Sequence, residues 1–358
     1  MTVTAKAPAP AAAPAALTIP ERLQRGAFTA LGRVPGRLLG RLAPRVVNAD
    51  GDVMAPEIAL MLKASAGAPD FSDGTPEQAR AIVAHDYRVF ADKAPSGVRV
   101  EPEIVMSGGL RATLYRPAAP SNALVLFLHG GGFVLSSRQD YDVPVRLIAD
   151  GAGVNVLSVE YGLAPASPFP GPVDDAVTAW RFAVEHCAEW GIDPTRIVLL
   201  GDSAGGNLCA VLANDLAGQT IRPYLQVLMY PFVDAAGVYP SRQEFAGNSA
   251  LSAKQIDWLA NLYVPGREDR FDPRISPMLA EDLSGAPPTL LTVAGFDPLR
   301  DEALAYAERL TESGVPVRVF REGGLVHGYI SMTRISPTAR AAVDRVAGAI
   351  RTSLKESR

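Results

Sequence analysis

The sequence has few residues of the kinds that build disulfide frameworks, metal sites or membrane spans. Its 358 residues include only two cysteines and four histidines. Cys187 and Cys209 lie in segments with helical patterning and have no Cys-x-x-Cys spacing, which excludes a disulfide framework and favours a reducing, cytoplasmic location. No apolar run reaches the roughly 18 residues that a membrane-spanning helix needs.

Motifs for nucleotides and metals are missing as well. There is no G-x-x-x-x-G-K-[ST] or G-x-G-x-x-G for phosphates, and no H-E-x-x-H or Cys/His cluster for a metal. We therefore expect neither a metal nor an organic cofactor. The 34 basic and 38 acidic residues give a net charge of −4, which offers no basic surplus for a nucleic-acid partner.

The composition is that of a large α/β domain, with 48% hydrophobic and 20% charged residues. Continuous apolar runs, typical of strands buried on both faces of a parallel sheet, alternate with helical patterns. These runs occupy 123–130, 155–161, 196–202, 225–233, 289–295 and 315–321. An antiparallel hairpin is expected before them, at 98–106 and 110–116. The pattern predicts a mostly parallel sheet of about eight strands flanked by helices.

Three segments fall outside this alternation. Residues 1–20, rich in Ala and Pro, are expected to form a disordered lead and lack the apolar core of a secretory signal. Residues 53–94 are typical of two helices, the second opening with Thr75 as N-cap and Pro76 in the first helical position. Residues 234–287 contain no strand pattern and are expected to be a helical excursion.

The arm at 21–47 combines arginines with apolar residues at helical spacing. It holds six arginines against one acid, Glu21, and Pro35 with Gly36 is expected to divide it into two helices. The apolar series is Leu23, Ala27, Leu31, Val34, Leu38 and Leu42. The interpretations are an arm packed on the body, contact with an anionic membrane surface, or a transit-peptide-like address.

The strongest local signal is GDSAGG at 201–206, between a strand-like run and a helical pattern. A serine on such a tight turn is strained, and a side chain at position 201 or 205 would collide with backbone. The turn presents the Ser203 hydroxyl at the carboxyl end of the sheet, where open α/β sheets bind ligands. We interpret Ser203 as a nucleophile; the alternative is a glycine-rich turn with an incidental serine. Asp202 is expected to be structural.

HGGGF at 129–133 directly follows a buried strand. Consecutive glycines leave backbone N–H groups uncovered, and the oxyanion of an acyl-transfer intermediate needs such donors. The N–H groups of Gly131, Gly132 and Ala204 would form this oxyanion hole; the alternative is a flexible loop. His129 is expected to fix the loop rather than to act as a base.

The base and the acid follow from position in the chain. His327 lies in a short loop after the last strand-like run, which is the base position in the α/β-hydrolase order of Ser, acid, His. Asp297 directly follows a strand-like run and is the preferred acid. Asp234 is its main rival, and Asp301 fits better as a charge at the start of a helix.

Six motifs occur in an order that resembles the hormone-sensitive-lipase family of α/β-hydrolase carboxylesterases, over roughly residues 53–350. They are HGGGF (129–133), YGLAP (161–165), GDSAGG (201–206), SP (276–277), FDPLRDE (296–302) and HG (327–328). The resemblance implies Ser203, Asp297 and His327 as catalytic residues, with Gly131, Gly132 and Ala204 as oxyanion donors. One departure is at 161–166, where the family's Y-R-L-A-P-E lacks its Arg and Glu here.

The resemblance also implies the domain division. Residues 96–233 and 288–358 would form the catalytic domain, and 21–95 with 234–287 a helical cap. In the cap, Trp258, Leu259, Leu262 and Tyr263 recur at near-helical spacing and with Phe133 would line an acyl pocket; the alternative is plain cap core. A cap limits the depth of the acyl site, so the family favours short to medium acyl chains. A homodimer is expected by resemblance only.

These inferences predict a serine carboxylesterase that acts on small-molecule esters without a metal or cofactor. An amidase or arylformamidase on the same three residues is the first alternative. A ligand-binding module that has lost catalysis is the second, and the presence of all three residues argues against it.

Overall fold

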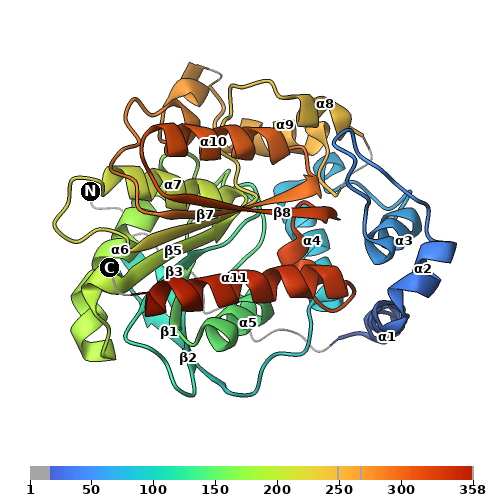
Figure 1. The fold of residues 1–358 in the computed structure, drawn as a ribbon, viewed down its shortest axis with the longest axis horizontal. Helices are drawn as coiled ribbons and strands as arrows, with labels where there is room; N and C mark the ends of the chain where they lie inside the picture. Colours follow the sequence, from blue (N-terminus) through green and yellow to red (C-terminus); the bar gives the residue numbers. More distant parts are fainter. Residues whose placement is uncertain (1–16, 248–249, 267, 357–358) are drawn as a thin grey trace, which may run out of the picture.

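A computed structural model describes residues 17–247, 250–266 and 268–356. Its centre is an eight-stranded sheet in the order β1-β2-β4-β3-β5-β6-β7-β8 (Figure 1). The strands are β1 (Val98–Val105), β2 (Arg111–Pro117), β3 (Leu124–Leu128), β4 (Asn155–Glu160), β5 (Ile197–Asp202), β6 (Leu225–Met229), β7 (Thr289–Phe296) and β8 (Val317–Val326). β2 is antiparallel to β1 and β4, and the other neighbouring pairs are parallel. The predicted sheet, with its antiparallel hairpin, is confirmed.

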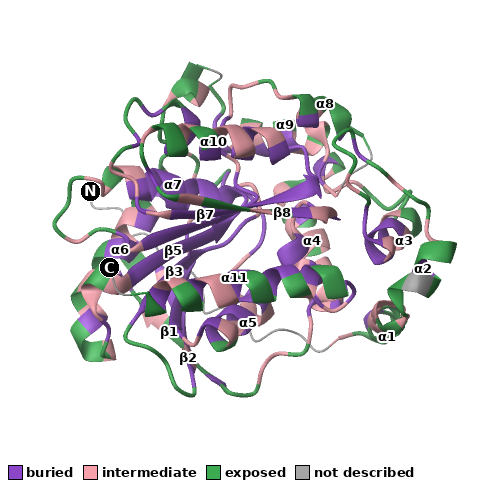
Figure 2. Cartoon of the chain, viewed as in Figure 1, coloured by how far each residue is buried: buried purple, intermediate pink, exposed green. Residues whose placement is uncertain are grey.

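Helices cover both faces of this sheet (Figure 1). One face carries α6 (Gly171–Trp190), α7 (Ala204–Asp215) and α10 (Arg300–Glu312), and the other carries α5 (Asp142–Ala152) and α11 (Pro337–Lys355). Each face of the sheet has its own hydrophobic core. Within β3, Leu126 packs into the core on the side of α6, α7 and α10, and Val125 and Phe127 pack into the core on the side of α5 and α11. Both sets are buried because helices leave the strands no solvent side, as Figure 2 shows for the whole centre of the sheet.

The remaining helices gather beyond the carboxyl ends of the parallel strands (Figure 1). They are α1 (Ile19–Arg33), α2 (Gly36–Leu42), α3 (Pro56–Ala64), α4 (Pro76–Phe90), α8 (Pro240–Glu244) and α9 (Ala253–Tyr263). α4 begins as predicted, because Thr75 caps it and exchanges hydrogen bonds with Gln78. The described part of 234–287 contains helices and turns but no strand. The division into cap and catalytic domain stays a prediction.

The arm at 21–47 contacts α4 through one face of α1. Glu21 accepts a hydrogen bond from Arg88 of α4 (2.8 Å), and Phe28 meets Phe90 edge-on (ring centroids 5.1 Å apart). Seven residues separate Glu21 from Phe28, so they share one helical face, whereas Leu23 points away and is 71% exposed. The exposed large apolar side chains of the arm are Leu23, Leu38, Leu42 and Val47, and Ile19, just before the arm, is exposed as well.

Most of the predicted lead at 1–20 falls outside the described residues, and its last two residues belong to α1. α1 and α2 are separate helices that meet around Pro35, as predicted. None of the helices in the described ranges is long and apolar enough to cross a membrane.

Candidate active site

Ser203 occupies a sharp turn between β5 and α7. Its backbone angles, φ 52° and ψ −118°, are strained for a residue with a side chain. A Cβ at Gly205 would overlap the carbonyl oxygen of Leu128, and one at Gly201 would overlap the backbone of Gly205. A side chain fits at neither position, so both must be glycine. This is the steric reason expected from the sequence motif.

The imidazole of His327 lies between Ser203 and Asp297. Its Nε2 is 2.9 Å from the Ser203 Oγ, and its Nδ1 is 2.8 Å from the Asp297 Oδ2. Asp297 directly follows β7 and His327 directly follows β8, which pairs with β7. The carboxyl ends of three parallel strands, β5, β7 and β8, thus bring together side chains that are 124 and 30 positions apart in the chain.

The rival acids contact other groups. Asp234 accepts a hydrogen bond from the hydroxyl of Tyr239 (2.7 Å) and from backbone N–H groups of its own turn. Asp301 pairs with the neighbouring arginine at the start of α10 (2.8 Å). Within the described ranges, Asp297 is the carboxylate that the structure places on His327.

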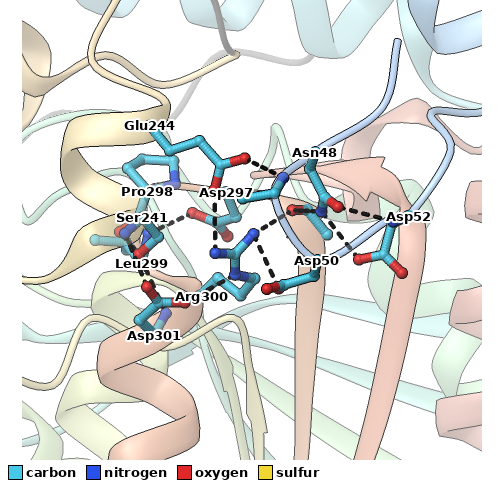
Figure 3. A network of polar contacts seen from close by, with 12 residues as sticks. Asn48, Asp50, Asp52, Ser241, Glu244, Asp297, Pro298, Leu299, Arg300 and Asp301 are labelled. Atoms are coloured by element: carbon cyan, nitrogen blue, oxygen red, sulfur yellow. Dashed lines mark hydrogen bonds and ion pairs between the residues drawn. The ribbon is translucent and has the colours of Figure 1, made fainter. Parts of the chain in front are cut away.

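Arg300 holds the loop that carries Asp297 (Figure 3). Its buried guanidinium donates to the carbonyl oxygen of Gly295 (3.1 Å). The same group pairs with Glu244 of α8 (3.1 Å) and with Asp50 of the N-terminal segment (3.3 Å). One side chain therefore connects both predicted cap segments to the loop that carries Asp297.

The surroundings of His327 favour its protonated form. Burial lowers the pKa of His327, whereas the charge and hydrogen bond of Asp297 raise it. The more distant charges of Asp202 and Glu302 act in the same direction, and the net effect raises the pKa above its ordinary value. An imidazole in this setting is suited to take a proton from a hydroxyl.

The glycine-rich loop after β3 brings bare N–H groups to the cavity that Ser203 lines. Gly131 and Gly132 have φ 117° and 60°, and a Cβ at Gly131 would overlap the carbonyl oxygen of Leu135. Within the described part of the chain, the N–H groups of Gly131, Gly132 and Ala204 have no acceptor. Free amides of this kind can stabilise an oxyanion.

Asp202 ties this loop to the turn of the serine, a connection that sequence patterns did not reveal. It accepts hydrogen bonds from the N–H of Gly130 (2.8 Å) and the hydroxyls of Tyr141 (2.9 Å) and Tyr230 (3.3 Å). Burial raises the pKa of Asp202 to about 6, although these hydrogen bonds oppose it. The residue before Ser203 therefore sets the position of the first loop glycine.

His129 and the segment at 161–166 are both structural supports. His129 stacks on Tyr161 (4.3 Å between centroids) and its Nδ1 lies 2.7 Å from the carbonyl oxygen of Gly130. Burial lowers the pKa of His129 to about 4, so the ring is neutral. The segment at 161–166, which lacks the Arg and Glu of the family motif, is held by α4 instead: Arg80 donates a hydrogen bond to the carbonyl oxygen of Ala164 (2.8 Å).

Two cavities meet at Ser203, with empty volumes of about 480 and 820 Å³ including the space open to solvent. The first lies under α9 and is almost entirely apolar. Its lining includes Phe133, Phe232, Ile256, Leu259, Ala260 and Tyr263. The second lies on the side of His327 and reaches α4. A bound ester would have one space for its acyl part and one for its alcohol part.

Of the five predicted pocket residues, Phe133, Leu259 and Tyr263 line the first cavity. The rings of Phe133 and Tyr263 stack on each other (3.8 Å between centroids). Trp258 and Leu262 line neither cavity, and Trp258 packs edge-on against Phe71. The reason is helical geometry: positions 256, 259, 260 and 263 of α9 share the face toward Ser203. Their spacing of i, i+3, i+4 and i+7 was the available sequence signal.

Comparisons with known proteins agree with this geometry. The alpha/beta hydrolase fold family matches residues 125–331. Ethyl acetate hydrolase of Pseudomonas putida is 39% identical over 68% of this chain and 79% of its own length. The carboxylic ester hydrolase LipN of Mycobacterium tuberculosis (strain ATCC 25618 / H37Rv) is 36% identical over 87% of this chain and 86% of its own. The solved structure of EstE1, a thermophilic carboxylesterase from a metagenomic library, is 36% identical with a TM-score of 0.74, covering 79% of this chain and 99% of its own.

The sheet, the serine turn and these similarities define an α/β-hydrolase, and the chain belongs to the alpha/beta hydrolase fold family. Within that family it is a carboxylesterase similar to the hormone-sensitive-lipase group, an enzyme that hydrolyses esters. The predicted family and enzyme class are confirmed.

Proposed function

We propose that the enzyme hydrolyses esters with short to medium acyl chains, with Ser203 as nucleophile, His327 as base and Asp297 as the acid that orients the base. The observation that carries the proposal is the continuous hydrogen-bonded series from the serine Oγ to Nε2 (2.9 Å) and from Nδ1 to the carboxylate (2.8 Å). A serine hydroxyl is a weak nucleophile until such a base activates it.

In the first half of the reaction, His327 takes the proton of Ser203 while Oγ bonds to the ester carbonyl carbon. The carbonyl electron pair moves to its oxygen, which accepts hydrogen bonds from the N–H groups of Gly131, Gly132 and Ala204. Loss of one donor raises the barrier by about 3–4 kcal/mol. The C–O bond to the alcohol then breaks, and His327 gives its proton to the leaving oxygen.

In the second half, His327 takes a proton from water, which attacks the acyl-enzyme and releases the carboxylic acid. The proton returns to Ser203. Throughout both halves, Asp297 holds the imidazole in the tautomer that has Nε2 free to accept a proton, and it stabilises the imidazolium.

The apolar cavity under α9 supports a short to medium acyl chain. Residues of α9 such as Leu259 line it and limit its depth. Leu259 lies close to the oxyanion loop, since a Cβ added at Gly132 would be 2.5 Å from the Cδ1 of Leu259. One relative of this chain is named an ethyl acetate hydrolase, and the acetyl group of that ester is a short acyl chain.

A panel of p-nitrophenyl esters from acetate to decanoate, beside matching anilides, tests the proposal. We expect the highest kcat/KM around butyrate and little anilide cleavage. Faster cleavage of the anilides would instead support an amidase or arylformamidase. Binding of esters without any turnover would support the ligand-binding module.

We also propose that the arm contacts an anionic membrane surface. Leu23 and Leu42 are exposed on α1 and α2, and so are Arg22 and Arg41. Exposed leucines beside arginines suit the boundary between headgroups and acyl chains. Co-sedimentation with vesicles that contain phosphatidylserine should exceed that with neutral vesicles, and Leu23→Ser with Leu42→Ser should abolish it. A homodimer and a cytoplasmic location stay predictions from the sequence.

A further inference from the structure

The second cavity contains a carboxylate that the proposed mechanism does not use. Asp86, on α4, lines the same cavity as Ser203 and His327. It is only partly exposed to solvent. Among the described residues that line this cavity there is no lysine or arginine, and the other carboxylate, Asp202, already accepts three hydrogen bonds. The cavity therefore has a negative wall.

The carboxylate of Asp86 has no hydrogen-bond or ion-pair partner among the described residues. The basic side chains closest to it along α4 are engaged elsewhere: His85 and Arg88 lie 3.1 and 2.8 Å from the carboxylate of Glu21 on α1. Burial raises the pKa of Asp86 to about 6, and the charge of His85 offsets only part of this effect. A desolvated carboxylate without a partner destabilises a fold, so a ligand that supplies the missing charge would explain it.

Aromatic rings complete the chemistry of this wall. Phe71, Tyr87 and Phe90 line the cavity together with Asp86. The faces of aromatic rings attract cations, and quaternary or protonated amines bind where such rings combine with an anionic group. A neutral alkyl group would gain from the rings but nothing from the carboxylate.

We propose that the second cavity is a subsite for the alcohol part of esters that carry a cationic nitrogen, with Asp86 as the residue that selects the charge. The assignment to the alcohol side rests on the proposed function. His327 lines this cavity and not the one under α9, and the leaving alcohol must lie where the imidazole can return its proton.

The test compares two esters of the same shape, butyrylcholine and 3,3-dimethylbutyl butyrate, which differ by nitrogen in place of carbon and hence by one positive charge. A pH-stat at pH 8 gives kcat/KM for each. We expect wild type to prefer the cation, and Asp86→Asn to lower the ratio of cationic to neutral kcat/KM by about tenfold, the equivalent of about 1.4 kcal/mol. Asn has the same shape and removes a desolvated charge, so the variant should fold.

Glu77→Gln is the matched control, because it removes one negative charge from an exposed position on the same helix, outside both cavities. It should leave the ratio within about twofold of wild type, as an exposed charge at a distance is screened by salt. If the ratio fell equally in both variants, the change in the protein's overall charge would explain the effect, and the subsite proposal would be wrong. An unchanged ratio in Asp86→Asn, or equal losses on both esters, would also overturn it.

The two proposals fail in different ways. If wild type hydrolyses neither p-nitrophenyl butyrate nor the neutral dimethylbutyl ester, the proposed catalytic function is wrong. If it hydrolyses both and shows no dependence of the ratio on Asp86, the esterase proposal stands and the cation subsite is wrong.

Discussion

The guanidinium of Arg300 lies 3.1 Å from the carboxylate of Glu244 and donates to the carbonyl oxygen of Gly295, two residues before Asp297 (Figure 3). The arginine side chain is only 3% exposed. A buried cation among several carboxylates is stable only while every partner is present. The position of Asp297 thus depends on segments that are distant in sequence.

We expect Arg300→Met to lower the free energy of unfolding by about 1–3 kcal/mol, because it leaves the buried carbonyl oxygen of Gly295 without its donor. Urea denaturation followed by circular dichroism measures the loss. Arg340→Met is the control, since Arg340 pairs with Asp92 and Asp344 at a site that is 37% exposed, where such pairs contribute about 0–1 kcal/mol. Equal losses in the two variants would contradict the role assigned to Arg300.

Ser203→Ala should lower the turnover of p-nitrophenyl butyrate by at least about 10⁴-fold, because within the described ranges His327 contacts the hydroxyl of Ser203 and of no other residue. A serine-directed phosphonate should label wild type at Ser203 alone, as peptide mass spectrometry would show. Ser313→Ala, at the end of α10, should keep wild-type activity. Substantial activity in Ser203→Ala would remove the proposed nucleophile.

Asp297→Asn should lower kcat by roughly 10³–10⁴-fold, since an amide holds the imidazole in the wrong tautomer. Asp234→Asn should have a small effect on kcat, because Asp234 bonds to Tyr239 and not to His327. Steady-state kinetics on one ester compares them. The opposite ranking would reassign the acid to Asp234.

The pH profile should report the raised pKa of His327. Only the neutral imidazole accepts a proton, so kcat/KM should fall as the pH drops through this pKa, with a midpoint above the ordinary value of 6.5. Asp297→Asn removes the main cause that raises the pKa, so the midpoint of its residual activity should move to lower pH. The rates are followed at the isosbestic wavelength of p-nitrophenol. A wild-type midpoint below 6.5 would show that burial, rather than Asp297, dominates.

Sequence patterns predicted the sheet, the turn of Ser203 and the strand-end positions of Asp297 and His327, because each depends on local periodicity or on a short motif. They did not predict the hydrogen bonds of Asp202 to Tyr141 and Tyr230, which join residues 61 and 28 positions away. Only the folded chain decides such contacts between distant positions.

The same limit applies to helix faces. The apolar spacing of α1 did not show which of its faces meets the body: Glu21 pairs with Arg88 of α4, and Leu23 on another face is 71% exposed. On α9, near-helical spacing alone did not distinguish the face of Trp258 from that of Leu259. Which apolar face is buried depends on the surface that a helix meets, and the helix sequence does not contain that surface.

The last prediction tests the face of α9 that lines the acyl cavity. Ala260 lines this cavity, whereas Leu262 does not. Ala260→Leu should fill part of the cavity and exclude part of a long acyl chain. Each excluded methylene group of the substrate loses about 0.8 kcal/mol of binding energy, which lowers kcat/KM by about fourfold. The ratio of hexanoate to acetate kcat/KM should fall by about tenfold or more. Leu262→Ala should leave this ratio near wild type; a larger shift from Leu262→Ala than from Ala260→Leu would place the acyl chain on the other face of the helix.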